Sequence, residues 1–314
     1  MAGPKNQSGL RGRYWDAKNK AQKKLLNELR KAGKKANGVI AMIDMGQIAT
    51  PGEATPFKHK DFPSGKLNEK NVLKAKKPSQ SGHAMEVAGI LDDVCDAEIR
   101  HYNVFDNGEL DTQALFDALE EIATSGDVAV VNLSIGIDHK EIDADTTLKD
   151  AITAAINKCV NAGVFVVAGI GESDTFSPAF PATLPNVISV SAVNAYDRPI
   201  TDSAKGALFS APGEGVDVMI DAGGYRKQDG SSYAAPYVAA SIWLALAANP
   251  ALNPKAVGGA NPQGPMLTLL QASSRPNSPL GSGATDDQKL QFEQRGSNGT
   301  IDIKQLALQL GVPV

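Results

Sequence analysis

The feature that most constrains this chain is an apolar run at residues 237–248, which follows the sequence Gly-Ser-Ser-Tyr-Ala-Ala-Pro at residues 230–236. Its Val, Ile, Trp and Leu residues are interspersed with alanines, a composition typical of a helix that is buried on all sides. A serine at the start of such a helix, such as Ser232, lies beside unpaired backbone N–H groups and the positive end of the helix dipole. Ser232 is therefore either a helix cap or a nucleophile, and the residues upstream distinguish the two.

Two upstream residues, Asp44 and His83, are candidates for the acid and the base that a nucleophile needs. Asp44 closes the apolar segment 38–43, and residues at the C-terminal ends of strands face ligands in open α/β sheets. His83 follows Gly82 and begins a stretch of small and apolar residues, 84–91, that is typical of a tightly packed helix. The structural alternatives are a turn or cap for Asp44 and a core position for His83. The order Asp…His…Ser is one of the chain orders of a catalytic triad.

Three segments resemble sequence motifs of the subtilase family of serine proteases. Residues 83–89, His-Ala-Met-Glu-Val-Ala-Gly, are similar to the family's His-Gly-Thr-His-Val-Ala-Gly. Residues 231–239, Ser-Ser-Tyr-Ala-Ala-Pro-Tyr-Val-Ala, are similar to Thr-Ser-Met-Ala-Ser-Pro-His-Val-Ala, and residues 43–46, Ile-Asp-Met-Gly, to Ile-Asp-Thr-Gly. Lesser landmarks occur in the family's order at residues 131–136, 180–182, 187–193, 209–219 and 299–307. The resemblance spans residues 38–312 and is closer to intracellular members than to secreted ones.

The resemblance implies a serine endopeptidase in which an acyl-enzyme forms on Ser232. His83 would take the proton of Ser232 and later donate it to the leaving amine, while Asp44 would fix the tautomer of His83. A protein or peptide substrate would bind as an extended strand. The resemblance places this substrate between two segments, Ser134, Ile135 and Gly136 on one side and Gly169, Ile170 and Gly171 on the other. Ile135 and Ile170 would make the nearer pocket apolar and favour an apolar P1 residue.

Glu172 occupies the position at which the family has an oxyanion asparagine, within residues 166–173. An ionised carboxylate cannot donate a hydrogen bond to an oxyanion, and loss of one such donor costs roughly 2.7–4 kcal/mol, or ~10²–10³ in turnover. A protonated Glu172 could donate instead, which predicts activity that favours acid pH. The alternative function is a catalytically impaired subtilase fold that acts as a binding or regulatory module.

No metal or other cofactor is expected from the sequence. Family members often carry a calcium loop between the histidine helix and the next strand, whereas here residues 91–96 connect the two directly. Asp92, Asp93 and Asp96 in this turn could bind a cation, but acidic residues in a tight turn are more often solvated. Calcium is therefore not carried over as a cofactor.

Residues 1–37 form a basic extension that holds eleven Lys or Arg residues and two acids. The remainder, residues 38–314, is the predicted catalytic domain and is acidic, because the whole chain has a net charge of −4. The extension is a solvated helix, a segment that docks on the acidic body, or a contact for nucleic acid or an anionic membrane. We favour docking because the charges are complementary, and docking would cover the active-site cleft or assist folding. No nucleic-acid recognition motif is present, so no nucleic-acid partner is expected.

The order of predicted elements indicates an α/β fold with a doubly wound, mostly parallel sheet and helices on both faces. The predicted strands are residues 39–43, 98–104, 128–133 and 164–168, and the predicted helices are residues 83–91, 112–124 and 146–161. Residues 47–80 and 274–299 are predicted to be loops. Cys95 and Cys159 are expected to be buried free thiols. No apolar stretch is long enough to span a membrane and no signal pattern is present, so we expect a cytoplasmic protein without membrane contact.

Overall fold

A nine-stranded sheet forms the centre of the structure, and every neighbouring pair of its strands but one is parallel. The computed structural model describes residues 23–28, 38–46, 59, 62, 66–70, 72–73, 82–172, 177–200, 203–220, 224–278, 285 and 297–312. The order across the sheet is β12 (Ser274–Arg275), β13 (Thr300–Ile301), β9 (Phe209–Pro212), β8 (Val187–Val193), β7 (Phe165–Gly169), β6 (Val128–Leu133), β1 (Val39–Asp44), β3 (Ile99–Asn103) and β2 (Leu67–Lys70). The single antiparallel pair joins β12 to β13 at one edge.

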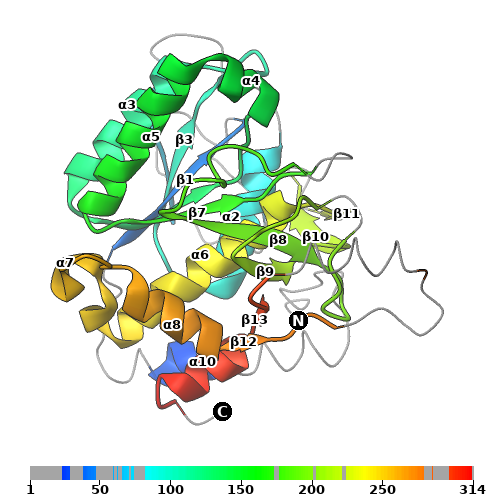
Figure 1. Ribbon diagram of the computed structural model, residues 1–314. Helices are drawn as coiled ribbons and strands as arrows, with labels where there is room; N and C mark the ends of the chain where they lie inside the picture. Colours follow the sequence, from blue (N-terminus) through cyan, green and yellow to red (C-terminus); the bar gives the residue numbers. More distant parts are fainter. Residues whose placement is uncertain are drawn as a thin grey trace.

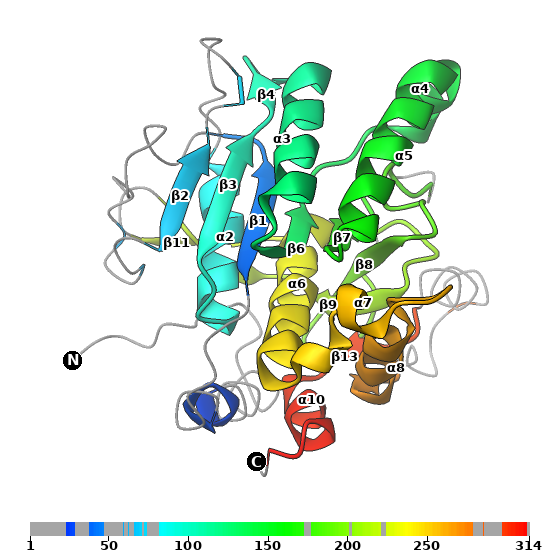
Figure 2. The same cartoon turned by 90° about the vertical axis from the view of Figure 1, so that its left-hand side faces the viewer.

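Helices cover both faces of this sheet (Figure 1 and Figure 2). One face is covered by α2 (His83–Val94) and α6 (Ser231–Ala248), and the other by α3 (Thr112–Ser125) and α5 (Thr146–Asn161). The remaining elements are shorter: α4 (His139–Ala144), the 3-10 helix η1 (Pro250–Leu252), α7 (Pro254–Val257), α8 (Gly264–Ala272), α10 (Ile303–Gln309), the hairpin of β4 (Phe105–Asp106) and β5 (Glu109–Leu110), and the hairpin of β10 (Val216–Met219) and β11 (Tyr225–Gln228). The predicted doubly wound α/β fold is confirmed.

The central strands are apolar at every position because both of their faces are buried. In β1, Ile40 and Met42 pack into the core under α2 and α6, whereas Ala41 and Ile43 pack into the core under α3 and α5. Successive strand side chains point to opposite faces, so Asp44 lies on the same face as Met42. The alternation therefore directs Asp44 toward α2, the helix that begins with His83.

The sheet reverses its winding direction between β1 and β6. After β1 the chain adds β2 and β3 on one side, and it then crosses through α3 to place β6, β7, β8 and β9 on the other side. Ligand crevices in open α/β sheets lie at the carboxyl ends of strands at such a switch point. Asp44 ends β1, and Ser134 directly follows β6, so both flank this position.

The structure corrects two of the predicted loops. Residues 67–70 lie within the predicted loop 47–80 but form β2, which pairs with β3 at the edge of the sheet. The segment 274–299 begins with β12, and much of the rest lies outside the described residues. Both strands are too short to carry a detectable alternation, and each is stabilised by its neighbour in the sheet rather than by its own sequence.

Both cysteines are buried and free, as expected, and burial raises the pKa of each thiol to about 12. In the part of the chain that the structure describes, no helix combines the length and the apolar character that a bilayer span requires. Because Cys95 and Cys159 are both free, no disulfide stabilises the core in the described residues.

Part of the basic extension packs against the core. Residues 23–28 form a short helix, and Leu25 on it is fully buried in the cluster that underlies α2 and α6. Figure 2 shows this helix, in dark blue, at the end of the molecule that holds α10, opposite the C-terminal ends of the strands. The helix thus lies away from the switch point, and the rest of residues 1–37 lies outside the described residues.

We predict that Leu25→Ala lowers the free energy of unfolding by about 2–5 kcal/mol, because it removes a fully buried leucine side chain. Urea denaturation of the full chain measures this difference. Lys24→Ala on the exposed side of the same helix is the matched control and should change stability by less than about 0.5 kcal/mol. Equal stability of the Leu25 and Lys24 variants would show that the helix does not dock in solution.

Candidate active site

Asp44, which is buried, and His83, which is partly exposed, form a hydrogen-bonded pair at the carboxyl end of β1. The Asp44 side chain is fully buried, and its Oδ1 lies 2.5 Å from His83 Nδ1 and 2.6 Å from the Met45 nitrogen, whose N–H it accepts. The first turn of α2 is tied to the same strand end, because the Ala84 N–H donates to the Met45 carbonyl at 3.1 Å. The strand end and the helix start therefore hold the two side chains together.

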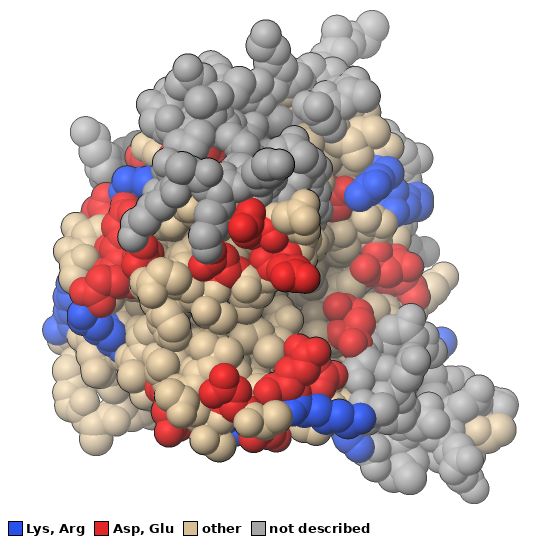
Figure 3. Space-filling view, turned by 90° about the horizontal axis from the view of Figure 1, so that it is seen from above, with Lys and Arg blue, Asp and Glu red and all other residues tan. Residues whose placement is uncertain are grey.

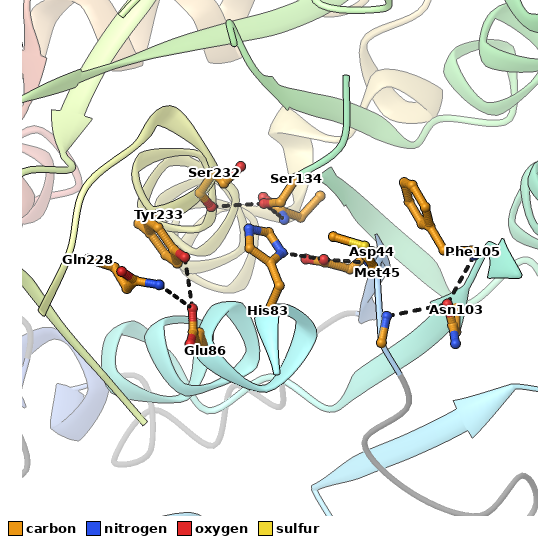
Figure 4. A network of polar contacts seen from close by, with 12 residues as sticks. Asp44, Met45, His83, Glu86, Asn103, Phe105, Ser134, Gln228, Ser232 and Tyr233 are labelled. Atoms are coloured by element: carbon orange, nitrogen blue, oxygen red, sulfur yellow. Dashed lines mark hydrogen bonds and ion pairs between the residues drawn. The ribbon is translucent and has the colours of Figure 1, made fainter. Parts of the chain in front are cut away.

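Ser232 lies in the first turn of α6 and is not its cap. The N-cap is Gly230, with φ 146°, which has no side chain to cap the helix. The backbone conformation of Gly230 is one that other residues rarely adopt, which explains a glycine there. Ser232 is half-buried, and its carbonyl accepts a hydrogen bond from Ser134 Oγ at 2.9 Å. Figure 4 shows the imidazole of His83 between Asp44 and Ser232.

The charges around His83 favour its protonated form. Burial by itself lowers the pKa of His83, but the carboxylates of Asp44, Glu86 and Glu172 together raise it above its ordinary value. Asp44 contributes both through its charge and through the hydrogen bond to Nδ1. A histidine that must accept a proton is effective only when neutral, so the raised pKa moves the onset of this function to higher pH.

Glu172 binds the amino end of α6 directly beside Ser232. Its Oε1 accepts a hydrogen bond from the Ser231 N–H, and Ser231 Oγ accepts one from the Gly171 N–H at 3.0 Å. Gly169 is required for this close approach, because a Cβ built there would lie 2.9 Å from Ser231 Oγ. The loop after β7 and the first turn of α6 are thus joined through backbone and small side chains, with the carboxylate next to the candidate nucleophile.

A cavity of about 240 Å³ opens next to Ser232. Its lining includes five of the six predicted substrate-binding residues: Ser134, Ile135, Gly136, Gly169 and Gly171. Ile170 is the exception, because its side chain is 1% exposed and packs into the core under α3 and α5. The prediction that Ile170 forms an apolar pocket wall is therefore wrong, because its side chain points into the core instead. Asp138, His139 and Glu172 are also in the lining, so the cavity is more polar than expected.

Exposed acidic side chains are frequent on the face shown in Figure 3. Those at α4 are Asp138, which caps it, Glu141 and Asp143 within it, and Asp145 at its end. Lys140 and Lys149 are the basic residues nearest to them in the sequence, and Lys149 pairs with Asp143 at 2.7 Å. The described surface beside the cavity is therefore predominantly acidic.

Sequence reasoning missed a second polar network beside His83. Glu86 on α2 is 1% exposed and accepts a hydrogen bond from the Tyr233 hydroxyl at 2.7 Å. The Tyr233 ring in turn lies against the His83 ring, with 5.5 Å between their centroids. The signal was present in the departures from the family motifs, since Glu86 stands where the motif has histidine and Tyr233 where it has methionine.

The acidic turn after α2 already has a cationic partner. The Lys66 ammonium is hydrogen-bonded to Asp92 Oδ1 and donates to the Cys95 carbonyl at 2.8 Å. The Lys66 and Asp92 side chains are 12% and 2% exposed. Among the described residues no group of three His, Cys, Asp or Glu side chains could hold a metal ion. Lys66 therefore supplies a positive charge to Asp92 within this turn.

A doubly wound α/β sheet with an Asp–His pair and a serine at a helix start defines a subtilisin-like hydrolase fold. A family model described as the subtilase family (peptidase S8) matches residues 7–260. This match covers most of the sequence, so the chain belongs to the subtilase family.

Similar proteins include a thermophilic serine proteinase from Bacillus sp. (strain AK1), which is 33% identical over 163 residues, or 51% of this chain and 38% of that protein. Subtilisin from Bacillus pumilus is 29% identical over 136 residues, or 41% of this chain and 46% of that protein. The chain thus spans less than half the length of these relatives.

Solved structures share the fold. A prenylagaramide maturation protease has a TM-score of 0.62 at 24% identity, and the superposition covers 91% of this chain and 98% of that one. The epidermin leader peptide processing serine protease of Staphylococcus aureus has a TM-score of 0.65 at 17% identity, covering 89% of this chain and 77% of that one. At these identities the comparison concerns the fold alone.

We predict that Lys66→Met lowers the free energy of unfolding by about 3–5 kcal/mol, because it removes the ammonium that is paired with the buried Asp92 carboxylate. Thermal and urea denaturation measure the change, and a chelator such as EDTA should leave the melting temperature of the unmodified protein unchanged. Lys70→Met is the matched control: its pair with Glu121 at 2.9 Å is about one-third exposed, so the loss should stay below about 1 kcal/mol. A chelator-induced drop in melting temperature would contradict the assignment of Lys66 as the cation.

Proposed function

We propose that this chain is a serine endopeptidase that uses Asp44, His83 and Ser232 as a catalytic triad. The observation that carries the proposal is the 2.5 Å hydrogen bond between buried Asp44 and His83 beside the first turn of α6, which holds Ser232. Membership of the subtilase family and similarity to named serine proteinases support it. Residues 38–314 would form the catalytic domain, and residues 1–37 an extension that assists its folding through Leu25.

In this proposal the reaction divides between the three side chains as in other triads. Ser232 Oγ attacks the scissile carbonyl while His83 Nε2 takes its proton. The imidazolium then gives that proton to the amine that leaves, and an acyl-enzyme remains on Ser232. Water then attacks the acyl-enzyme while His83 Nε2 takes its proton, and the proton returns to Ser232 Oγ as the acid product leaves. Asp44 keeps Nδ1 protonated through its hydrogen bond, so Nε2 is the nitrogen that would act as base.

The substrate would be a peptide in extended form. It would lie between residues 134–136 and residues 169–171, where backbone groups of the two strand ends border the cavity. Similar folds occur in proteases named for prenylagaramide maturation and for epidermin leader peptide processing, and the second name supports a peptide as the substrate class. The apolar P1 preference expected from the sequence now rests on Ile135 alone, since Ile170 is buried elsewhere.

Glu172 would limit the stabilisation of the tetrahedral oxyanion. The Ser232 N–H would be one donor, and the group at Glu172 would be expected to provide the second. Its Oε1 accepts from Ser231, so this oxygen would not serve as the donor. This arrangement is also the observation that favours the second candidate function, a binding or regulatory module with little turnover.

We predict that a fluorophosphonate probe labels the unmodified protein and fails to label Ser232→Ala, because only an activated serine hydroxyl reacts. Peptide cleavage should fall at least ~10³-fold in the same variant. Ser125→Ala, at the exposed end of α3, serves as the control and should label like the unmodified chain. A folded protein that neither labels nor cleaves any peptide would favour the binding module instead.

We predict that Glu172→Gln raises kcat at neutral pH by about 10-fold or more, because the amide keeps the acceptor for Ser231 and adds an oxyanion donor. Loss of the negative charge also lowers the pKa of His83, so the acid limb of kcat/KM should move to lower pH. A pH–rate profile with a peptide substrate measures both effects. Glu141→Gln on exposed α4 makes the same charge change and should alter neither. An unchanged kcat would mean that Glu172 is not at the oxyanion position.

A further inference from the structure

The buried carboxylate of Glu86 is outside the triad, and both of its oxygens have partners. Glu86 lies one helical turn after His83 on α2 and is 1% exposed. Its Oε2 accepts from the Tyr233 hydroxyl at 2.7 Å, and its Oε1 forms an ion pair with Arg226 Nη2. A buried carboxylate is costly unless it is paired and hydrogen-bonded, so this arrangement requires both partners.

Tyr233 connects Glu86 to the imidazole. It directly follows Ser232 in α6 and is 5% exposed, and its ring is tilted by 49° to the His83 ring at 5.5 Å between centroids. Burial and the hydrogen bond to Glu86 raise the pKa of the Tyr233 phenol, so its hydroxyl remains a donor. The hydrogen bond therefore fixes the ring that limits the movement of His83 on the side away from Asp44 (Figure 4).

Arg226 comes from a separate element, strand β11 of the β10–β11 hairpin. Its side chain is 53% exposed, yet its guanidinium reaches the buried Glu86 carboxylate. The next residue, Lys227, pairs instead with Asp217 across the hairpin at 3.2 Å. The hairpin thus contributes the Arg226 charge to Glu86, whereas the Lys227 charge is paired within the hairpin.

We propose that Arg226, Glu86 and Tyr233 are positioning residues that hold the His83 ring and set the charge around it. The role in turnover rests on the proposed function, whereas the effect on His83 does not. The groups that face His83 are Asp44 from β1, Glu86 from α2, Glu172 after β7, Tyr233 from α6 and, through Glu86, Arg226 from β11.

Substitutions of Arg226 and of Glu86 are expected to shift the titration midpoint of His83 in opposite directions. Arg226→Gln leaves Glu86 without its cation, so the imidazolium gains stability and the titration midpoint of His83 rises. Glu86→Gln removes the carboxylate, so the midpoint falls. A purely structural role predicts no such opposition of sign.

The test is an NMR titration of the His83 imidazole in full-length protein that carries Ser232→Ala, with the signal assigned by its loss in His83→Gln. The midpoint should rise by about 0.5 pH unit or more in Arg226→Gln and fall by a similar amount in Glu86→Gln. Arg226→Lys should restore the value of the parent. Lys227→Gln removes the adjacent charge on the same strand and should leave the midpoint within about 0.2 pH unit of the parent.

Activity gives a second readout. The acid limb of kcat/KM, measured with Ser232 present, should follow the same order as the titration midpoints. Tyr233→Phe keeps the ring but loses the bond to Glu86, and it should lower kcat several-fold with little change in KM. If the titration midpoint of His83 shifts as expected but the protein and its variants show no peptidase activity, the positioning network is supported and the proposed function is rejected. A midpoint that is unchanged in Arg226→Gln, which alters a half-exposed side chain, overturns the proposal.

Discussion

The hydrogen bond between Asp44 and His83 is the contact on which the rest of the site depends. It joins the end of β1 to the start of α2, and it gives a polar partner to a carboxylate that is fully buried at the point where the sheet reverses its winding. A buried charge of this kind is tolerated only with such a partner. Once the two are fixed, the imidazole faces the first turn of α6. Helix α6 then places Ser232 beside the imidazole.

The surroundings of this pair are acidic, although His83 would have to be neutral to act as a base. Glu86 lies one turn along α2, and Glu172 lies at the amino end of α6, and each favours the imidazolium. Arg226 offsets the first carboxylate, whereas the second is compensated by the Ser231 N–H at the positive end of the helix dipole. The balance between these partners, rather than the triad alone, would decide the pH range in which the site can act.

Much of the fold follows from local sequence pattern. The predicted strand at residues 128–133 and the helix at residues 146–161 agree with β6 and α5 at both ends, because apolar runs and Asp145 at the helix start are local signals. The short strand β2 was predicted as loop because its pairing with β3 is not encoded in its own residues. Ile170 was assigned to the pocket from the family resemblance, but its side chain packs into the core under α3 and α5, whereas the flanking Gly169 and Gly171 contact Ser231.

The sequence by itself determined which residues stand at the strand ends and helix starts, namely Asp44, His83 and Ser232, and it determined that Glu172 departs from the family pattern. These features are local, since each is read within a few residues of an apolar run. Only the tertiary structure decided what Glu172 binds, that Arg226 reaches Glu86, and that Lys66 pairs with Asp92. Those contacts join segments that are 59, 140 and 26 residues apart, and no local pattern can specify which distant group will meet a carboxylate.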